Sequence, residues 1–258
     1  MEAVTYVGHA TTLLALGGAT VLTDPVFGRW IGPLRRQVPD AAIGSLTRAD
    51  VVVISHLHRD HLDLRSLRLL PSATPVVVPR GAGSIVSRAG ASEVVEVVEG
   101  DVVDVPGLRI TAVRARHDPS RGPLGPRAAP IGAILASSRK RVYFAGDTEL
   151  FPEMDSLGRL DLALLPVWGW GPRVGPGHLT PATAATALTR LRPRRAVPIH
   201  WGTYYPAGLR RLVARHLERP PFEFARIAAE IAPEIDVEVL RPGERLALDD
   251  PGRPGATP

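Results

Sequence analysis

Short apolar runs separated by turn residues recur along the 258 residues of this chain. Their lengths and their enrichment in β-branched residues favour strands over helices. We therefore expect strands over residues 4–7, 12–16, 20–22, 51–54, 76–78, 94–98, 108–113, 131–136, 142–144, 162–165 and 196–199. Many strands with a few interspersed helices predict a layered α/β protein.

Helical patterns are fewer and shorter. The best one begins at Thr180, a favourable N-cap, followed by Pro181 at the first helical position, and runs to about Leu191. The other expected helices cover residues 62–70, 83–89 and 208–217. The Gly/Pro-rich tracts 27–45 and 119–130 are expected to be loops. We find no linker that splits the chain, so we expect one domain over residues 1–248 and a disordered tail over 249–258.

Composition narrows the classes of function. The chain has no cysteine, which excludes disulfides and thiolate metal sites, so any metal site must use other donors such as carboxylates. The net charge is only +5, and no basic run alternates with aromatic residues as a nucleic-acid groove requires. We therefore expect no nucleic-acid partner, and a weak attraction for small anionic substrates.

The N-terminal region argues against membrane insertion. The chain enters a strand pattern at once, without the basic segment of a signal peptide. The apolar stretch 12–22 is interrupted by Gly17 and Gly18, which indicates a hairpin turn rather than a membrane span. We expect a cytoplasmic protein with no stable membrane insertion, and the sequence leaves oligomer formation open.

The most informative segment reads Ser-His-Leu-His-Arg-Asp-His over residues 55–61, directly after an apolar run. Imidazole and carboxylate groups bind divalent metals such as zinc. A strand that runs into a turn can direct His56 and His58 to one ion, and Asp60 and His61 to a second. The alternative is a solvated polar loop, but this pattern arises by chance in only about one sequence per thousand.

Four more polar residues stand near strand ends or loops: His117, Asp147, His178 and His200. Polar groups at strand ends gather on one edge of a sheet, where such folds place their chemistry. A lone histidine there is usually structural. Beside the cluster at residues 56–61 a closed metal site still lacks ligands, so we interpret His117 and His200 as ligands.

The pattern His-x-His-x-Asp-His after an apolar strand resembles the metallo-β-lactamase fold superfamily. Five segments narrow the resemblance to one branch of this superfamily, which contains N-acyl-phosphatidylethanolamine phospholipase D and L-ascorbate-6-phosphate lactonase. These segments are residues 7–11, 22–27, 55–63, 143–148 and 199–203. The similarity extends to about Pro206. It implies a four-layer αββα sandwich of two pseudo-symmetric halves that join near residue 105. It does not imply a substrate, because one fold supports many chemistries.

The same resemblance implies a dinuclear metal centre. Its ligands would be His56, His58 and His117 for the first ion, Asp60, His61 and His200 for the second, and Asp147 as the bridge. This set suits two Zn²⁺ ions, and manganese or iron are compatible with it. Two adjacent cations can share a water, lower its pKa to about 7 and present hydroxide to an electrophile.

Several further residues are assigned with open alternatives. His178 is either a substrate-facing proton donor or oxyanion stabiliser, or a structural histidine near the helix start. Trp168, Trp170 and Trp201 either line an apolar substrate pocket or belong to the core. His9 and Asp24 are expected to orient ligands rather than to bind metal.

Arginines near the expected site suggest anion binding. Arg121 follows His117 by four positions, where the resembling phospholipase branch has an arginine, and could clamp phosphate or carboxylate; Arg173 is a weaker candidate. Asp118 stands where that branch usually has an aromatic residue, which weakens the case for phospholipid specificity.

The leading hypothesis is a dinuclear metal-dependent hydrolase in which a metal-bridging hydroxide attacks a phosphodiester or a lactone/ester. Asp60 and His178 are its candidate catalytic residues, and Arg121, Trp168 and Trp170 its candidate substrate contacts. The alternatives are a nuclease of the same fold, disfavoured because the chain lacks room for an additional RNA-processing domain, and a metal-binding protein without turnover.

Overall fold

The computed structural model describes residues 1–39, 43–122, 125–171, 173–209 and 215–249. Two seven-stranded sheets dominate it. The first contains, in spatial order, β17 (Arg245–Ala247), β1 (Ala3–Gly8), β2 (Thr11–Leu16), β3 (Ala19–Thr23), β6 (Val51–Val53), β7 (Val76–Pro79) and β8 (Val94–Val97). The second contains β16 (Asp236–Val237), β14 (Arg195–Ile199), β13 (Leu162–Pro166), β12 (Arg141–Phe144), β11 (Ile131–Ala136), β10 (Leu108–Arg114) and β9 (Val102–Val105).

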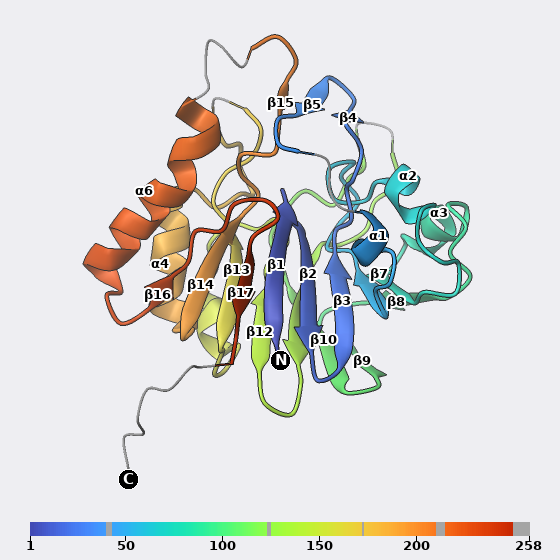
Figure 1. Ribbon diagram of the computed structural model, residues 1–258, viewed down its shortest axis with the longest axis horizontal. Coiled ribbons are helices and arrows are strands. Elements are labelled where there is room, and N and C mark those ends of the chain that lie inside the picture. Colours follow the sequence, from blue (N-terminus) through green and yellow to red (C-terminus); the bar gives the residue numbers. More distant parts are fainter. Residues whose placement is uncertain (40–42, 123–124, 172, 210–214, 250–258) are drawn as a thin grey trace.

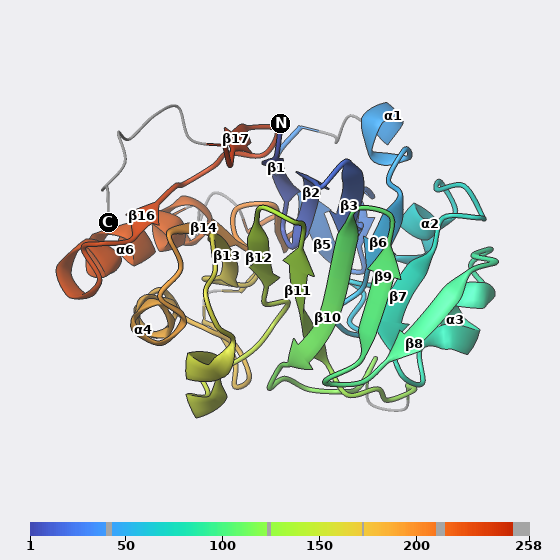
Figure 2. The same cartoon turned by 90° about the horizontal axis from the view of Figure 1, so that it is seen from below.

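Helices cover the two outer faces (Figures 1 and 2). The long helices α4 (Pro181–Leu191) and α6 (Arg215–Ile231) pack on each other and on β13 and β14 of the second sheet. The short helices α1 (Ile43–Leu46), α2 (Leu64–Leu67) and α3 (Gly83–Ser87) lie on the side of the first sheet, and a 3₁₀ helix, η1 (Pro152–Ser156), contacts α4. The predicted four-layer αββα sandwich is confirmed.

Alternation along the inner strands explains why their sequences are apolar throughout. In β6, Val51 and Val53 join the core between the sheets, whereas Val52 and the following Ile54 join the cluster on the outer face of the first sheet. A strand buried on both faces needs apolar residues at every position rather than at every second one. This run ends at Ser55, where the polar motif begins.

Every expected strand is present with ends that differ by no more than one residue, and α4 spans the predicted residues. Helix α2 is shorter than predicted. The tract 27–45 was wrongly expected to be irregular, because it contains α1 and the strands β4 (Trp30–Ile31) and β5 (Leu34–Arg36). These two strands form a small sheet with β15 (Tyr204–Pro206). Two- and three-residue strands carry no readable alternation, which is why the sequence did not indicate them.

The helix expected over residues 208–217 falls half on residues that the structure does not describe, 210–214, and its last three residues, 215–217, belong to a helix. This helix, α6, continues to Ile231. It contains Pro220 and Pro221, which normally interrupt helices and therefore concealed its length. No helix among the described residues is both long enough and apolar enough to cross a membrane.

The chain passes from the first sheet to the second between β8 and β9, close to the predicted junction near residue 105. Strand β17 then returns to pair with β1. Asp249, the first residue of the predicted tail, accepts a hydrogen bond from the backbone N–H of Glu2 (2.9 Å). Residues 250–258 of that predicted tail lie outside the described residues.

Candidate metal centre

The polar motif and the other candidate ligands meet at one edge of the sandwich. The segment 55–61 follows β6 of the first sheet, while His117, Asp147 and His200 follow β10, β12 and β14 of the second. Strands β12, β13 and β14 are parallel, so their carboxyl ends reach the same edge. The order of strands therefore brings together residues that are far apart in the sequence.

The candidate ligands form two neighbouring clusters. The coordinating atoms of His56, His58 and His117 lie within 4.8 Å of one another, and Nε2 of His117 is 3.0 Å from Nδ1 of His58. Asp60, His61 and His200 form the second group, in which the Nε2 atoms of the two histidines are 3.0 Å apart. The two groups contain the two ligand sets that the resemblance implies, and His9 joins the second group.

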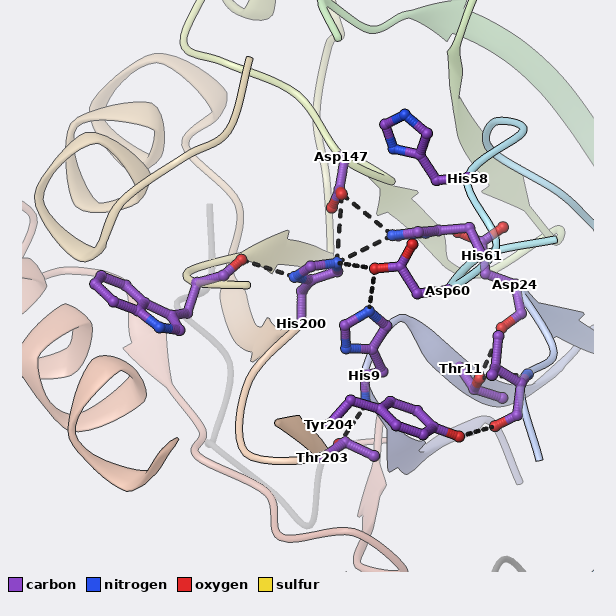
Figure 3. A network of polar contacts seen from close by, with 12 residues as sticks. His9, Thr11, Asp24, His58, Asp60, His61, Asp147, His200, Thr203 and Tyr204 are labelled. Carbon is purple, nitrogen blue, oxygen red and sulfur yellow. Dashed lines mark hydrogen bonds and ion pairs between the residues drawn. The ribbon is translucent and has the colours of Figure 1, made fainter. Parts of the chain in front are cut away.

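Asp147 lies between the clusters. Its Oδ2 is 3.1 Å from Nε2 of His61 and 3.3 Å from Nε2 of His200, as Figure 3 shows. The same oxygen is 4.0 Å from Nε2 of His56 and 3.9 Å from Nε2 of His117. One carboxylate that faces both clusters has the position of a bridging ligand.

The chemistry of these atoms fits divalent cations. Nε2 of His56 and Oδ1 of Asp147 are buried without a hydrogen-bond partner. Buried polar atoms normally find partners, and those without one call for an explanation such as a bound ion. The facing imidazole nitrogens of His61 and His200 give the same indication, because a cation would satisfy both lone pairs at once.

Hydrogen bonds at the opposite ring nitrogens fix the orientation of the ligands. Nδ1 of His117 donates to the carbonyl of Gly177 (2.8 Å), and Nδ1 of His200 donates to the carbonyl of Trp168 (2.7 Å). A carbonyl can only accept, so the proton resides on Nδ1 and the lone pair of Nε2 faces the site. Every residue has a backbone carbonyl, so the sequence could not indicate that these two carbonyls orient the histidines.

Asp24 has the orienting position that the sequence predicts for it. Its Oδ2 is 2.6 Å from Nδ1 of His61 and accepts from the hydroxyl of Ser55 (2.6 Å), while Oδ1 accepts from the N–H of Ser55 (2.7 Å). The Ser55 hydroxyl is also 2.9 Å from Nδ1 of His56. One buried carboxylate therefore connects to a histidine in each cluster.

His9 contacts the second cluster. Its Nε2 is 3.0 Å from Oδ2 of Asp60, and its backbone N–H donates to Oγ1 of Thr203 (2.7 Å). Figure 3 shows His9 behind Asp60, on the side away from Asp147. This position suits a residue that orients Asp60, although its ring also lies within 4.8 Å of the other ligand atoms of that cluster.

The backbone is strained around the second cluster. His9, Asp24 and His200 have positive φ angles of 57°, 34° and 62°. Residues other than glycine rarely adopt such angles, and they concentrate at functional sites where the surrounding structure enforces them. Gly146, with φ of 60°, precedes Asp147, and a Cβ there would collide with the Ser55 side chain. A glycine is thus needed for Asp147 to approach the loop.

The shifted pKa values of most candidate ligands favour the protonation states that bind cations. Burial lowers the pKa of His117 to about 4 and holds the pKa of His56 and His200 well below the usual value. Burial alone would raise the pKa of Asp147, but its interactions with the His200 and His61 rings and its hydrogen bonds with His178 and His61 outweigh burial and hold that pKa well below its usual range. Neutral imidazoles and ionised carboxylates are the forms that bind metals.

His61 is the exception. Burial would lower its pKa, but the carboxylates of Asp147 and Asp24 outweigh burial and raise the pKa well above the usual value. A protonated His61 offsets the charge of these two carboxylates, as a cation would. Cation binding in the second cluster would therefore release a proton.

Arg121 does not line the pocket beside the clusters. Its guanidinium donates to the carbonyl of Leu57 (2.7 Å), inside the ligand motif, and to the carbonyl of Leu62 (3.1 Å), directly after it. These bonds hold the motif loop against the segment that follows His117. The substrate role of Arg121 stays a prediction, and its contacts favour a structural one.

A cavity of about 440 Å³ opens beside the two clusters. Its walls include His58, Asp60, Asp147, His178 and Trp170. Trp170 is 44% exposed, as a substrate contact would be. The half-buried Trp168 instead packs against the core and donates from its indole N–H to the carbonyl of Gly171 (3.0 Å), and Trp201 is buried against Tyr6. Of the three tryptophans, Trp170 therefore lines the cavity, whereas Trp168 and Trp201 pack with the core.

We expect Asp24→Asn to weaken metal binding by about 10- to 100-fold, because an amide cannot accept from both Ser55 and His61 as the carboxylate does. Asparagine tolerates the positive φ, so the backbone should be retained. Competition with a chromogenic chelator measures the affinity. Asp50→Asn is the matched control, since Asp50 also accepts backbone and hydroxyl hydrogen bonds but lies on an exposed turn. Equal affinities of the two variants would refute the orienting role.

Comparison with known proteins agrees with this geometry. A model of the beta-lactamase superfamily domain matches residues 19–201. A protein of Methanopyrus kandleri named metal-dependent hydrolase MK1542 is 32% identical, with 93% of this chain and 97% of that protein covered. Another metal-dependent hydrolase, of Caldivirga maquilingensis, is 28% identical over 94% of this chain and 96% of that protein.

Solved structures share the fold. Igni18, described as a metallo hydrolase of Ignicoccus hospitalis, is 27% identical with a TM-score of 0.72, covering 95% of this chain and 97% of that one. Isothiocyanate hydrolase from Delia radicum gut bacteria is 20% identical with a TM-score of 0.71, covering 95% and 98%. The second likeness concerns the fold alone.

Proposed function

This chain belongs to the metallo-β-lactamase superfamily, and we propose that it is a metal-dependent hydrolase that acts on a small-molecule phosphodiester or lactone/ester at a centre of two divalent cations. The observation that carries this proposal is the position of Asp147 Oδ2, within 4.0 Å of ring nitrogens from both histidine clusters. A structural metal site needs one closed set of ligands. Two adjacent sets of candidate ligands that share a carboxylate exceed what a metal site that only stabilises the fold requires.

We assign the ligands as the resemblance implies. His56, His58 and His117 would hold one cation, and Asp60, His61 and His200 the other, with Asp147 shared. Imidazole and carboxylate donors suit zinc and are compatible with manganese or iron. Bound cations would supply Lewis acidity and lower the pKa of water to about 7.

His178 has the position of a proton donor. It lines the cavity, and its Nε2 is 3.5 Å from Oδ2 of Asp147. Its Nδ1 lies 3.2 Å and 3.1 Å from the carbonyls of Gly175 and Pro176. Burial would lower its pKa, but the Asp147 carboxylate and these carbonyls raise it above the usual value. A raised pKa extends the pH range over which the ring is protonated and can give a proton to a leaving group.

The two candidate substrate types are those that the resemblance of the motifs to the phospholipase D and lactonase branch suggests. Trp170 would contact the substrate, because it is half-exposed on the cavity wall. Phospholipid itself is disfavoured by Asp118, an acidic residue in the place of an aromatic one.

A direct test is a hydrolysis screen with bis(p-nitrophenyl) phosphate and a set of lactones, using protein loaded with zinc, manganese or iron. We expect turnover with one of these substrate types, loss of turnover after chelation, and recovery when metal is returned. Absence of turnover with every metal and substrate, in folded protein that binds metal, would favour a metal-binding protein without catalysis.

A further inference from the structure

The cavity beside the metal centre carries two positive charges that the proposed catalysis does not use. Arg59 and Arg173 are both exposed on its wall. Within the described residues, neither guanidinium has a hydrogen-bond or ion-pair partner. Other arginines near the site differ, since Arg116 pairs with Glu153 and Arg121 with backbone carbonyls.

The charge balance of the cavity leaves these two arginines uncompensated. The acidic residues on its wall are Asp60 and Asp147. Asp60 contacts His9 at 3.0 Å, and Asp147 contacts His61 at 3.1 Å. Cations bound by the same carboxylates would neutralise them further. A cavity whose remaining fixed charges are positive attracts anions.

The two arginines come from different segments. Arg59 is the spacer between the candidate ligands His58 and Asp60, and its exposed side chain remains outside the clusters. Arg173 belongs to the loop between Trp168 and His178, which contributes the remaining wall. An anionic group held between them would lie near the centre without occupying a ligand position. Guanidinium groups bind carboxylate and phosphate oxygens through charge-assisted hydrogen bonds.

We propose that Arg59 and Arg173 form an anion subsite, which selects substrates carrying a carboxylate or phosphate group separate from the bond that is hydrolysed. The proposal rests on the proposed hydrolase function. It names the substrate class as small anionic esters, and it replaces Arg121 with Arg59 and Arg173 as the cations that recognise the substrate.

A matched pair of esters tests this selection: mono(4-nitrophenyl) glutarate and its methyl ester, which share the scissile bond and differ in one distal negative charge. For Arg59→Ala and Arg173→Ala we expect KM for the anionic ester to rise about tenfold each, with kcat within about twofold. KM for the neutral ester should not change. Arg88→Ala removes an exposed arginine at the C-cap of α3, which does not line the cavity, and is the matched control. Equal effects on both esters, or no effect on either, would overturn the proposal.

A binding measurement keeps this test independent of turnover. Zinc-loaded protein is titrated calorimetrically with glutarate and with glycerol 3-phosphate, in parallel with the Arg59→Ala/Arg173→Ala double variant of equal metal content. We expect at least one anion to bind the wild type, and the double variant to bind it at least about tenfold more weakly. Equal affinities, or no binding of either anion, would overturn the subsite. If neither ester is hydrolysed but this difference is found, ester hydrolysis fails while the anion subsite stands.

Discussion

Replacing His61 by alanine is expected to lower turnover by at least about 10³-fold and to remove one metal ion more readily than the other. Its Nε2 contacts both His200 and Asp147, and its Nδ1 contacts the buried Asp24, so no other side chain can take its place. Asp60→Ala should likewise remove one metal ion more readily than the other, because Asp60 belongs to the same cluster as His61.

The measurement combines elemental analysis with steady-state kinetics on the substrate that the wild type hydrolyses. Metal content should fall from near two toward one per chain in both variants. Asp155→Ala, an exposed aspartate that pairs with Arg190 on the surface, serves as the control and should resemble the wild type. Near-normal turnover in either ligand variant would show that the two-metal mechanism is wrong.

His178→Ala is expected to retain both ions while kcat falls by roughly 10²- to 10⁴-fold, the range for loss of a positioned acid or base. A general acid works only while it is protonated. Wild-type kcat should therefore decline as the pH rises through the raised pKa of His178, and the variant should lack this alkaline decline.

The outcomes for His178→Ala distinguish three roles. Loss of an ion would make His178 a metal ligand with His117 and Asp147, whose atoms lie within 4.8 Å of it. Unchanged kinetics and stability would make it a surface residue without function. Lower thermal stability with normal turnover per folded molecule would support a structural role at the start of α4.

Most of the sheet structure was readable because strands buried on both faces leave uninterrupted β-branched runs. The run at 51–54 is an example: its residues face the two cores alternately, and the polar motif begins where the strand stops. The strands β5 and β15 were not readable, because each is three residues long and their pairing joins segments far apart in the sequence. The continuation of helix α6 to Ile231 was not predicted, because its two internal prolines normally interrupt a helix.

The candidate ligands could be recognised because imidazole and carboxylate groups at strand ends have few structural uses in such density, whereas their division into two sets came from the resemblance to the superfamily. The groups around the ligands could not be recognised. The carbonyls of Trp168 and Gly177, which orient His200 and His117, have no side-chain signature. Arg59 was hidden by its place as a spacer within the motif, and the role that we propose for it depends on a cavity wall that only the fold assembles.

The most direct test of the dinuclear centre is the metal content of protein purified without chelators. Elemental analysis of the wild type, before and after incubation with zinc, manganese or iron and removal of excess metal, gives the number of ions per folded chain. We predict a content that approaches two. A content near zero that none of these metals restores would contradict the assignment of His56, His58, Asp60, His61, His117, Asp147 and His200 as ligands.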